Sequence, residues 1–145
     1  TASLAMRLDS ISAVDVREAA NGDRITPGVV YIAPGDYHIQ AGKGDVLYLS
    51  QEPPQHGVRP SANVLMKSVA KMYGGMAIGV VLTGMGVDGR DGVLEIKENG
   101  GQTICEAEES CVVFGMPRAA IETGKVDFVV PLNSMADEII NVVFS

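Results

Sequence analysis

A short apolar run with a helical pattern on each side limits most strongly what this chain can fold into. Residues 77–83 read AIGVVLT, which is rich in β-branched side chains and typical of a strand covered on both faces. Before this run, residues 62–73 place apolar side chains at the spacing of one helical face, and two glycines follow. After it, residues 90–99 predict a second helix that ends at another pair of glycines. Such a succession of helix, strand and helix is typical of α/β proteins.

The same alternation continues to the end of the chain. Residues 102–106 and 126–130 predict two more strands, and between them Pro117 and Gly124 suit the start and the end of a helix. A last amphipathic helix is predicted from its apolar positions, which are Met135, Ala136, Ile139, Ile140 and Val143. The sequence therefore predicts a doubly wound, three-layer αβα fold around a mostly parallel sheet.

The first third of the chain carries a different pattern. The strand-like pieces VDVREA, VVYIA and VLYLS are separated by turn sequences such as NGD, PGDY and AGKGD, which predicts an antiparallel hairpin insert. Residues 1–11 predict a helix with Leu4, Ala5, Leu8 and Ile11 on one face. Because no strand precedes this helix, we expect the chain to begin inside a domain whose first strands are missing.

Composition narrows the classes of function. The chain has 18 acidic and 11 basic residues, and the basic residues are scattered, which argues against nucleic acid as a partner. Neither a long apolar run nor a signal peptide is present, so we expect a cytoplasmic protein without membrane insertion. Cys105 and Cys111 have no metal-ligand spacing, and we expect reduced thiols, no metal and no cofactor.

Candidate chemistry lies directly after the central strand, where α/β proteins gather ligands and catalytic groups. The segment reads GMGVDG, and Gly84, Gly86 and Gly89 match a dinucleotide-binding fingerprint, with Glu106 near the distance of a ribose-binding acid. Asp88 argues against this interpretation, because a carboxylate already at the anion site would repel a phosphate.

The position of Asp88, between a predicted strand and a predicted helix, allows two other interpretations. It could be the third member of a Ser-His-Asp triad, held ionised by the glycine-loop amides and by the dipole of the following helix. It could also cap that helix, a role for which Asp91 is the preferred candidate. Ser61 is expected to cap the helix over residues 62–73.

Four phrases of the chain give it a specific resemblance. VYIAPGDYH, HGVRPS, VLTGMGVDG and SCVVFGMPRAAIETGKVD closely resemble the CheB family of chemotaxis protein-glutamate methylesterases. The resemblance implies that residues 1–145 form the C-terminal part of the catalytic domain and contain no receiver domain. It makes Asp88 the triad aspartate, and it implies methyl ester hydrolysis, with glutamine deamidation in some members, on chemotaxis receptors.

The resemblance also implies which parts of the site lie elsewhere. The family's serine and histidine phrases do not occur in these residues, so we expect this fragment alone to be inactive. Met85 and Gly86 are expected to border the reacting carbonyl, although core packing is an equal alternative for Met85. His38 is expected to be structural, and His56 and Arg59 to shape a loop near the site. The remaining alternatives are a non-catalytic receptor-binding module and the dinucleotide-binding domain, and an upstream receiver domain stays open.

Overall fold

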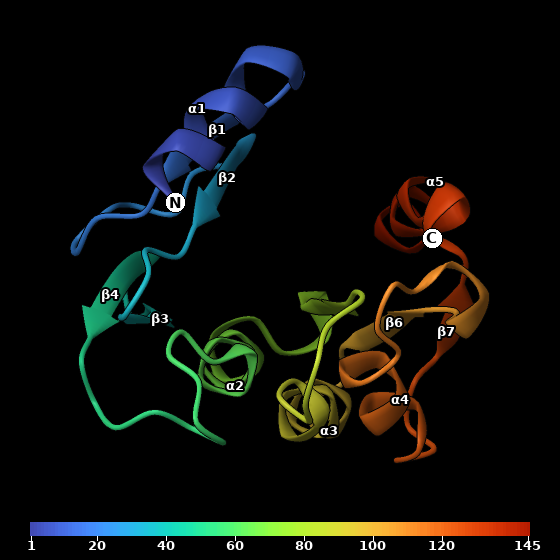
Figure 1. The fold of residues 1–145 in the computed structure, drawn as a ribbon. Helices are drawn as coiled ribbons and strands as arrows, with labels where there is room; N and C mark the ends of the chain where they lie inside the picture. Colours follow the sequence, from blue (N-terminus) through green and yellow to red (C-terminus); the bar gives the residue numbers. More distant parts are fainter.

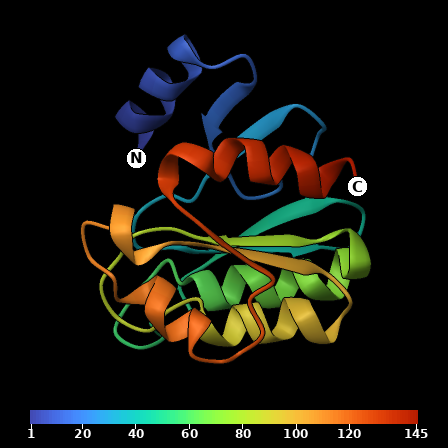
Figure 2. The same cartoon turned by 90° about the vertical axis from the view of Figure 1, so that its right-hand side faces the viewer.

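The computed structural model describes residues 1–145 as helices stacked on both sides of short sheets (Figure 1). Three strands form a parallel sheet in the order β5-β6-β7. A view turned by 90° shows α5 on one side of these strands and α2, α3 and α4 on the other, which is the predicted three-layer arrangement (Figure 2). The elements of this half are α2 (Ala62–Tyr73), β5 (Ile78–Val81), α3 (Arg90–Glu98), β6 (Gln102–Glu106), α4 (Met116–Ile121), β7 (Phe128–Val130) and α5 (Leu132–Val143).

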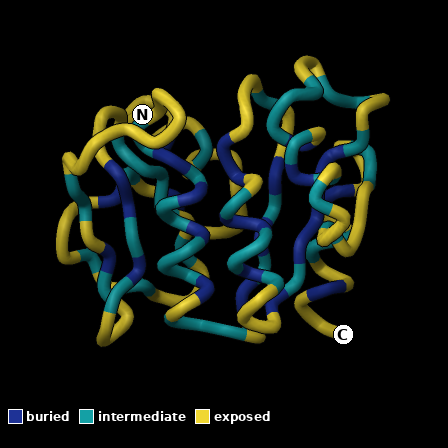
Figure 3. Tube along the Cα trace, turned by 90° about the horizontal axis from the view of Figure 1, so that it is seen from below, coloured by how far each residue is buried: buried dark blue, intermediate teal, exposed yellow.

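The two faces of this parallel sheet have separate apolar cores. Val81 and Cys105 face α2, α3 and α4, where Val93 and Ala120 are fully buried. Ile104 faces the opposite side and packs on α5. Figure 3 shows buried segments in the interior of both halves of the molecule and exposed segments mainly in the loops and at the ends. Burial on both faces explains why β5 reads as a continuous apolar run in the sequence, whereas β7, at the edge of the sheet, is largely exposed.

The first half of the chain differs from its prediction in how the strands pair. Its elements are α1 (Ala2–Ile11), β1 (Asp15–Glu18), β2 (Val29–Ile32), β3 (His38–Gly42) and β4 (Val46–Ser50). Only β3 and β4 form an antiparallel hairpin, whereas β1 and β2 pair in parallel. The connection between β1 and β2 first runs along β4, where Gly22 and Ile25 donate to the carbonyls of Leu47 and Asp45. This detour lets the chain enter β2 in the same direction as β1.

The last helix buries only part of the predicted face, because Met135 and Ile139 pack on the core but Ala136 is exposed. Met135 and Val142 are buried, while Ile140 and Val143 are each 54% exposed. The rest of the alternation agrees with the sequence, including the helix over residues 62–73 and the strand that follows it. None of the helices is both long enough and apolar enough to cross a bilayer.

Helices α2 and α3 approach each other closely because Gly92 lies where they cross. A Cβ atom at Gly92 would lie 2.7 Å from both Cβ and Sδ of Met66. Met66 is itself buried in the core between the two helices and β5. The absence of a side chain at Gly92 therefore sets the spacing between α2 and α3.

Asp127 joins β7 to α3 and β6. Its carboxylate accepts hydrogen bonds from Nζ of Lys97, at 2.9 Å, and from the backbone N–H of Thr103, at 2.8 Å. Burial acts to raise the pKa of Asp127, but the hydrogen bonds and charge of Lys97 and the bonds from Thr103 outweigh it, so the pKa lies below the ordinary 3.8. These bonds stabilise the ionised form only in the folded state.

We expect the Asp127→Asn substitution to lower the free energy of unfolding at pH 7 by about 1 to 2 kcal/mol, because charge-assisted hydrogen bonds are lost. Since folding lowers this pKa, the contribution is present above the ordinary value of 3.8 and is lost as the pH falls through the lowered folded value. Urea unfolding of both proteins at pH 7 and in acid measures the effect. A difference that did not shrink in acid would contradict this assignment.

Candidate functional site

Two loops meet at the carboxyl ends of β5 and β6. Residues 82–89 follow β5, residues 107–115 follow β6, and Gly84 forms a bridge with Phe114 between them. The carbonyl of Gly84 accepts from the amides of Gly115 and Met116, at 3.1 and 2.8 Å. A Cβ atom at Gly115 would lie 2.7 Å from the Gly84 carbonyl oxygen, so only glycine allows the backbones to come this close. The two loops therefore form one rigid unit.

Side chains at the strand ends hold this unit in place. Oγ1 of Thr83 accepts from the amide of Val113 at 2.8 Å and donates to its carbonyl at 3.1 Å. The fully buried carboxylate of Glu106 accepts from the amide of Thr83 at 2.8 Å and from the hydroxyl of Ser110 at 2.9 Å. Both oxygens of Glu106 are thus bound inside the protein. This arrangement contradicts the role of a ribose-binding acid and argues against the dinucleotide interpretation.

Asp88 lies at the end of the first loop and is 7% exposed. Its Oδ1 accepts from the hydroxyl of Ser61 at 2.6 Å and from the amide of Asn63 at 3.2 Å. Its Oδ2 accepts from the amide of Ala62 at 2.5 Å. The donors are therefore not the glycine amides expected from the sequence but the first residues of α2.

The start of α3 is bound in return by a residue of α2. Oδ1 of Asn63 accepts from the amides of Gly89 and Gly92, at 2.9 and 2.8 Å. These amides belong to the first turn of α3, where backbone donors have no partner within the helix. Asp88, which precedes α3, thus binds the start of α2, and Asn63 of α2 binds the start of α3. Asp88 does have a capping role, but on α2 rather than on the helix that follows it in sequence.

Ser61 precedes α2 but does not act as the predicted cap. Its hydroxyl donates to Asp88, and the structure has no bond from the helix to that hydroxyl. The amide of Ser61 donates to Nδ1 of His38 at 3.2 Å, and Nε2 of His38 lies 3.0 Å from the carbonyl of Pro53. Because Nδ1 accepts, the proton of this imidazole lies on Nε2, where it meets that carbonyl. The structural role predicted for His38 is confirmed.

The contact between His38, Ser61 and Asp88 is not a catalytic triad. A nucleophilic serine donates its proton to an imidazole, whereas the hydroxyl of Ser61 donates to the carboxylate. Ser61 is 1% exposed, which leaves no room for a substrate. Neither His38 nor His56 is hydrogen-bonded to Asp88 among the 145 residues.

The thiols do not supply a nucleophile either. Cys105 and Cys111 are both free in the structure, and Cys105 is buried. Burial, together with the nearby Cys111, raises the pKa of Cys105 to about 12. Burial also raises the pKa of Cys111, and the charge of Glu106 adds to this effect. At neutral pH both are therefore unreactive thiols rather than thiolates.

Met85 and Gly86 lie at the exposed tip of the first loop. The Met85 side chain is 83% exposed, so the alternative that it packs in the core is wrong. Gly86 has a φ of 97°, a left-handed conformation that suits glycine. Both residues precede Asp88 on the same rigid loop. Both residues thus lie on the surface of the loop that follows β5.

His56 and Arg59 organise the segment that leads into α2. Arg59 donates to the carboxylate of Asp36, at 2.7 Å, and to the carbonyls of Gln51 and Glu52. His56 lies 4.0 Å from Asp91, and both side chains are half exposed. Asp91 lies in the first turn of α3 but makes no capping hydrogen bond. Arg59 therefore shapes this loop, as expected, while the capping role predicted for Asp91 is not present.

Sequence reasoning missed Asn63. The apolar stripe used to predict α2 places Asn63 off the buried face, yet it is fully buried together with Met66 and Ala70. These three positions form a second stripe, turned toward α3. A polar residue in the first turn of such a stripe was the signal, because buried polar side chains usually bind a partner. Oδ1 of Asn63 does so, whereas its Nδ2 has no partner in the structure.

Comparisons with known proteins agree on one family. A sequence model described as CheB methylesterase matches residues 1–139. The protein-glutamate methylesterase/protein-glutamine glutaminase of Pyrococcus abyssi is 48% identical over 146 residues, and that of Clostridium acetobutylicum is 49% identical over 143 residues. The alignments cover 99% of this chain but only 40% and 41% of these relatives. The chain thus spans about two fifths of their length.

A solved structure has the same fold. The crystal structure of the Thermotoga maritima CheB methylesterase catalytic domain matches with a TM-score of 0.94 and 44% sequence identity. The match covers 99% of this chain and 77% of that chain. The predicted three-layer α/β fold is therefore confirmed.

Proposed function

Because the chain belongs to the CheB methylesterase family, we propose that it forms the C-terminal part of a catalytic domain that hydrolyses glutamate methyl esters on chemotaxis receptors. The names of its relatives extend the proposal to the deamidation of glutamine side chains. In this proposal a serine and a histidine from residues outside the 145 complete the site.

The observation that carries the proposal is the way in which Asp88 is held. A carboxylate has about four positions that can accept a hydrogen bond, and three of them are occupied by Ser61, Ala62 and Asn63. The free position is on Oδ2. An N–H of an imidazole would bind there, and a carboxylate fixed by three donors would hold that ring in one orientation.

The reaction then follows the serine hydrolase scheme. The imidazole takes the proton of the serine hydroxyl as its oxygen attacks the ester carbonyl, and the leaving methoxide receives that proton to become methanol. Water hydrolyses the acyl-serine and releases the glutamate carboxylate. The backbone amide of Met85 or Gly86, on the loop that also carries Asp88, is proposed to donate to the developing oxyanion.

Methanol release from methylated receptor tests the function. The full-length polypeptide that contains these residues should release methanol, and the 145-residue chain alone should release none. Receptor binding without methanol release by the full-length polypeptide would instead favour a non-catalytic binding module. Turnover by the isolated chain at the full-length rate would disprove the proposal that essential groups lie outside it.

A further inference from the structure

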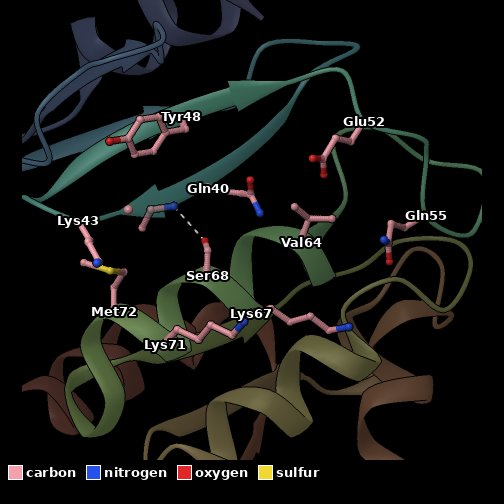
Figure 4. Close-up of a pocket in the computed structure, with 12 residues that line it drawn as sticks. Gln40, Lys43, Tyr48, Glu52, Gln55, Val64, Lys67, Ser68, Lys71 and Met72 are labelled. Carbon is pink, nitrogen blue, oxygen red and sulfur yellow. Dashed lines mark hydrogen bonds between the residues drawn. The ribbon is translucent and has the colours of Figure 1, made fainter.

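A groove with unpaired lysines runs along α2, beside the hairpin of β3 and β4. It encloses about 500 Å³ and is drawn in Figure 4. The hairpin and the segment after it contribute one wall, and α2 contributes the other. Its polar and charged lining residues are Gln40, Lys43, Tyr48, Glu52, Gln55, Lys67, Ser68 and Lys71.

The local structure keeps this groove open. The amide of Ala41 donates to the hydroxyl of Ser68 at 2.9 Å, which ties β3 to α2. The ring of Tyr48 lies across Gly42, where a Cβ atom would be 2.3 Å from the ring. Gly42 therefore lets the aromatic ring lie flat along the hairpin and form part of the wall. A groove framed by these fixed contacts does not depend on a mobile loop.

The groove carries mostly positive charge, whereas the chain as a whole is negative. The formal net charge is −7, yet Lys43, Lys67 and Lys71 all line this one groove. The four ion pairs of the structure involve none of them. Lys67 and Lys71 are one helical turn apart, where like charges repel by a few tenths of a kcal/mol. Figure 4 shows their side chains running in the same direction along α2.

The spacing of the lysines indicates a row of negative charges rather than a single phosphate. Lys67 and Lys71 are separated by about 6 Å along the helix axis, and Lys43 comes from the opposite wall. Phosphate sites use converging amides or a bidentate arginine, and no arginine lines this groove. Alternate carboxylates of an extended peptide recur at about 6.6 Å, which matches this spacing.

We propose that this groove binds an acidic segment of the protein substrate and so contributes to substrate choice. This inference rests on the proposed function, because Asp88 binds the first amides of α2 and Val64 of the groove directly follows Asn63. A substrate segment lying along α2 would place its acidic side chains on Lys67 and Lys71 while its reacting residue lies near Asp88. Glu52 also lines the groove, near Gln55, and its negative charge repels an acidic segment.

Binding of a labelled hexaglutamate peptide to the full-length polypeptide, measured by fluorescence anisotropy at low salt, tests the groove without catalysis. The triple variant K43Q/K67Q/K71Q should bind about tenfold more weakly, and E52Q about twofold more tightly. Lys125, which lies beside α3 and outside the groove, provides the control variant K125Q, which should bind as the unmodified protein does. Equal binding by the triple variant, or equal weakening by K125Q, would overturn the proposal.

Kinetics then connect the groove to the reaction. With methylated receptor, the triple variant should raise KM about tenfold and leave kcat unchanged, and high salt should reduce the difference. Hydrolysis of a small neutral methyl ester should be unaffected. An unchanged KM for the receptor would overturn the proposal. If the unmodified protein hydrolysed neither substrate, the proposed function would fail, whereas the hexaglutamate titration would still decide whether the groove binds acidic peptides.

Discussion

Replacing Asp88 by asparagine in the full-length polypeptide is expected to lower kcat for methyl ester hydrolysis by about 10³- to 10⁴-fold. An asparagine side chain is uncharged, so it does not stabilise the imidazolium formed as serine loses its proton. Its amide nitrogen also cannot accept the hydrogen bond that Oδ2 receives from Ala62 or Oδ1 from Asn63. Methanol release under saturating receptor measures the change in kcat.

The effect on catalysis has to be separated from the effect on α2. Ser61→Ala removes one hydrogen bond to Asp88 without changing its charge, so it should lower stability by about 1 to 2 kcal/mol and kcat by less than tenfold. Circular dichroism and urea unfolding of both variants show whether each is folded. A folded Asp88→Asn protein with nearly unchanged kcat would remove Asp88 from the mechanism.

Replacing Asn63 by alanine is expected to have the largest effect on stability, about 2 to 4 kcal/mol. The substitution leaves the buried amides of Gly89 and Gly92 without an acceptor and opens a small void between α2 and α3. It also loosens the loop that carries Asp88, so kcat should fall as well. Urea unfolding of the catalytic domain within the full-length polypeptide measures the first effect, and methanol release the second.

Asn99 provides a matched control for Asn63. It lies at the exposed end of α3, where its side-chain amide donates to the carbonyl of Glu95 at 2.8 Å. Water can replace that bond, so Asn99→Ala should cost less than about 1 kcal/mol. If both alanine variants lost the same stability, the buried hydrogen bonds of Asn63 would not hold the two helices as described.

The second half of the fold could be predicted because helices alternate with strands there, and β5 and β6 are covered on both faces. The run over residues 77–83 and the helix patterns around it follow from burial alone, and the structure confirms them. The pairing of the first strands could not be predicted in this way. β3 alternates His38 and Gln40 with Ile39 and Ala41, but it is short and lies outside the three predicted strand pieces, and the parallel pairing of β1 with β2 depends on contacts of their connection with β4.

The position of Asp88 was predictable, but the groups that hold it were not. The glycines around Asp88 and the end of β5 indicated a buried, functional carboxylate, and it is buried. Its donors come from residues 61–63, more than 20 positions earlier in the chain, and no local pattern reveals such a contact. For the same reason, Ser61 and Asp91 were assigned as ordinary caps of their own helices.

The absence of a side chain at Gly92 has a consequence for how this protein can change over time. The same narrow crossing that Gly92 permits also carries the exchanged bonds of Asp88 and Asn63. An added methyl group there would push α2 and α3 apart and disturb the hydrogen bonds that hold the Asp88 carboxylate. Drift in the packing of these two helices is therefore restrained by the need to keep the Asp88 carboxylate in place, even at a position outside the loop that carries it.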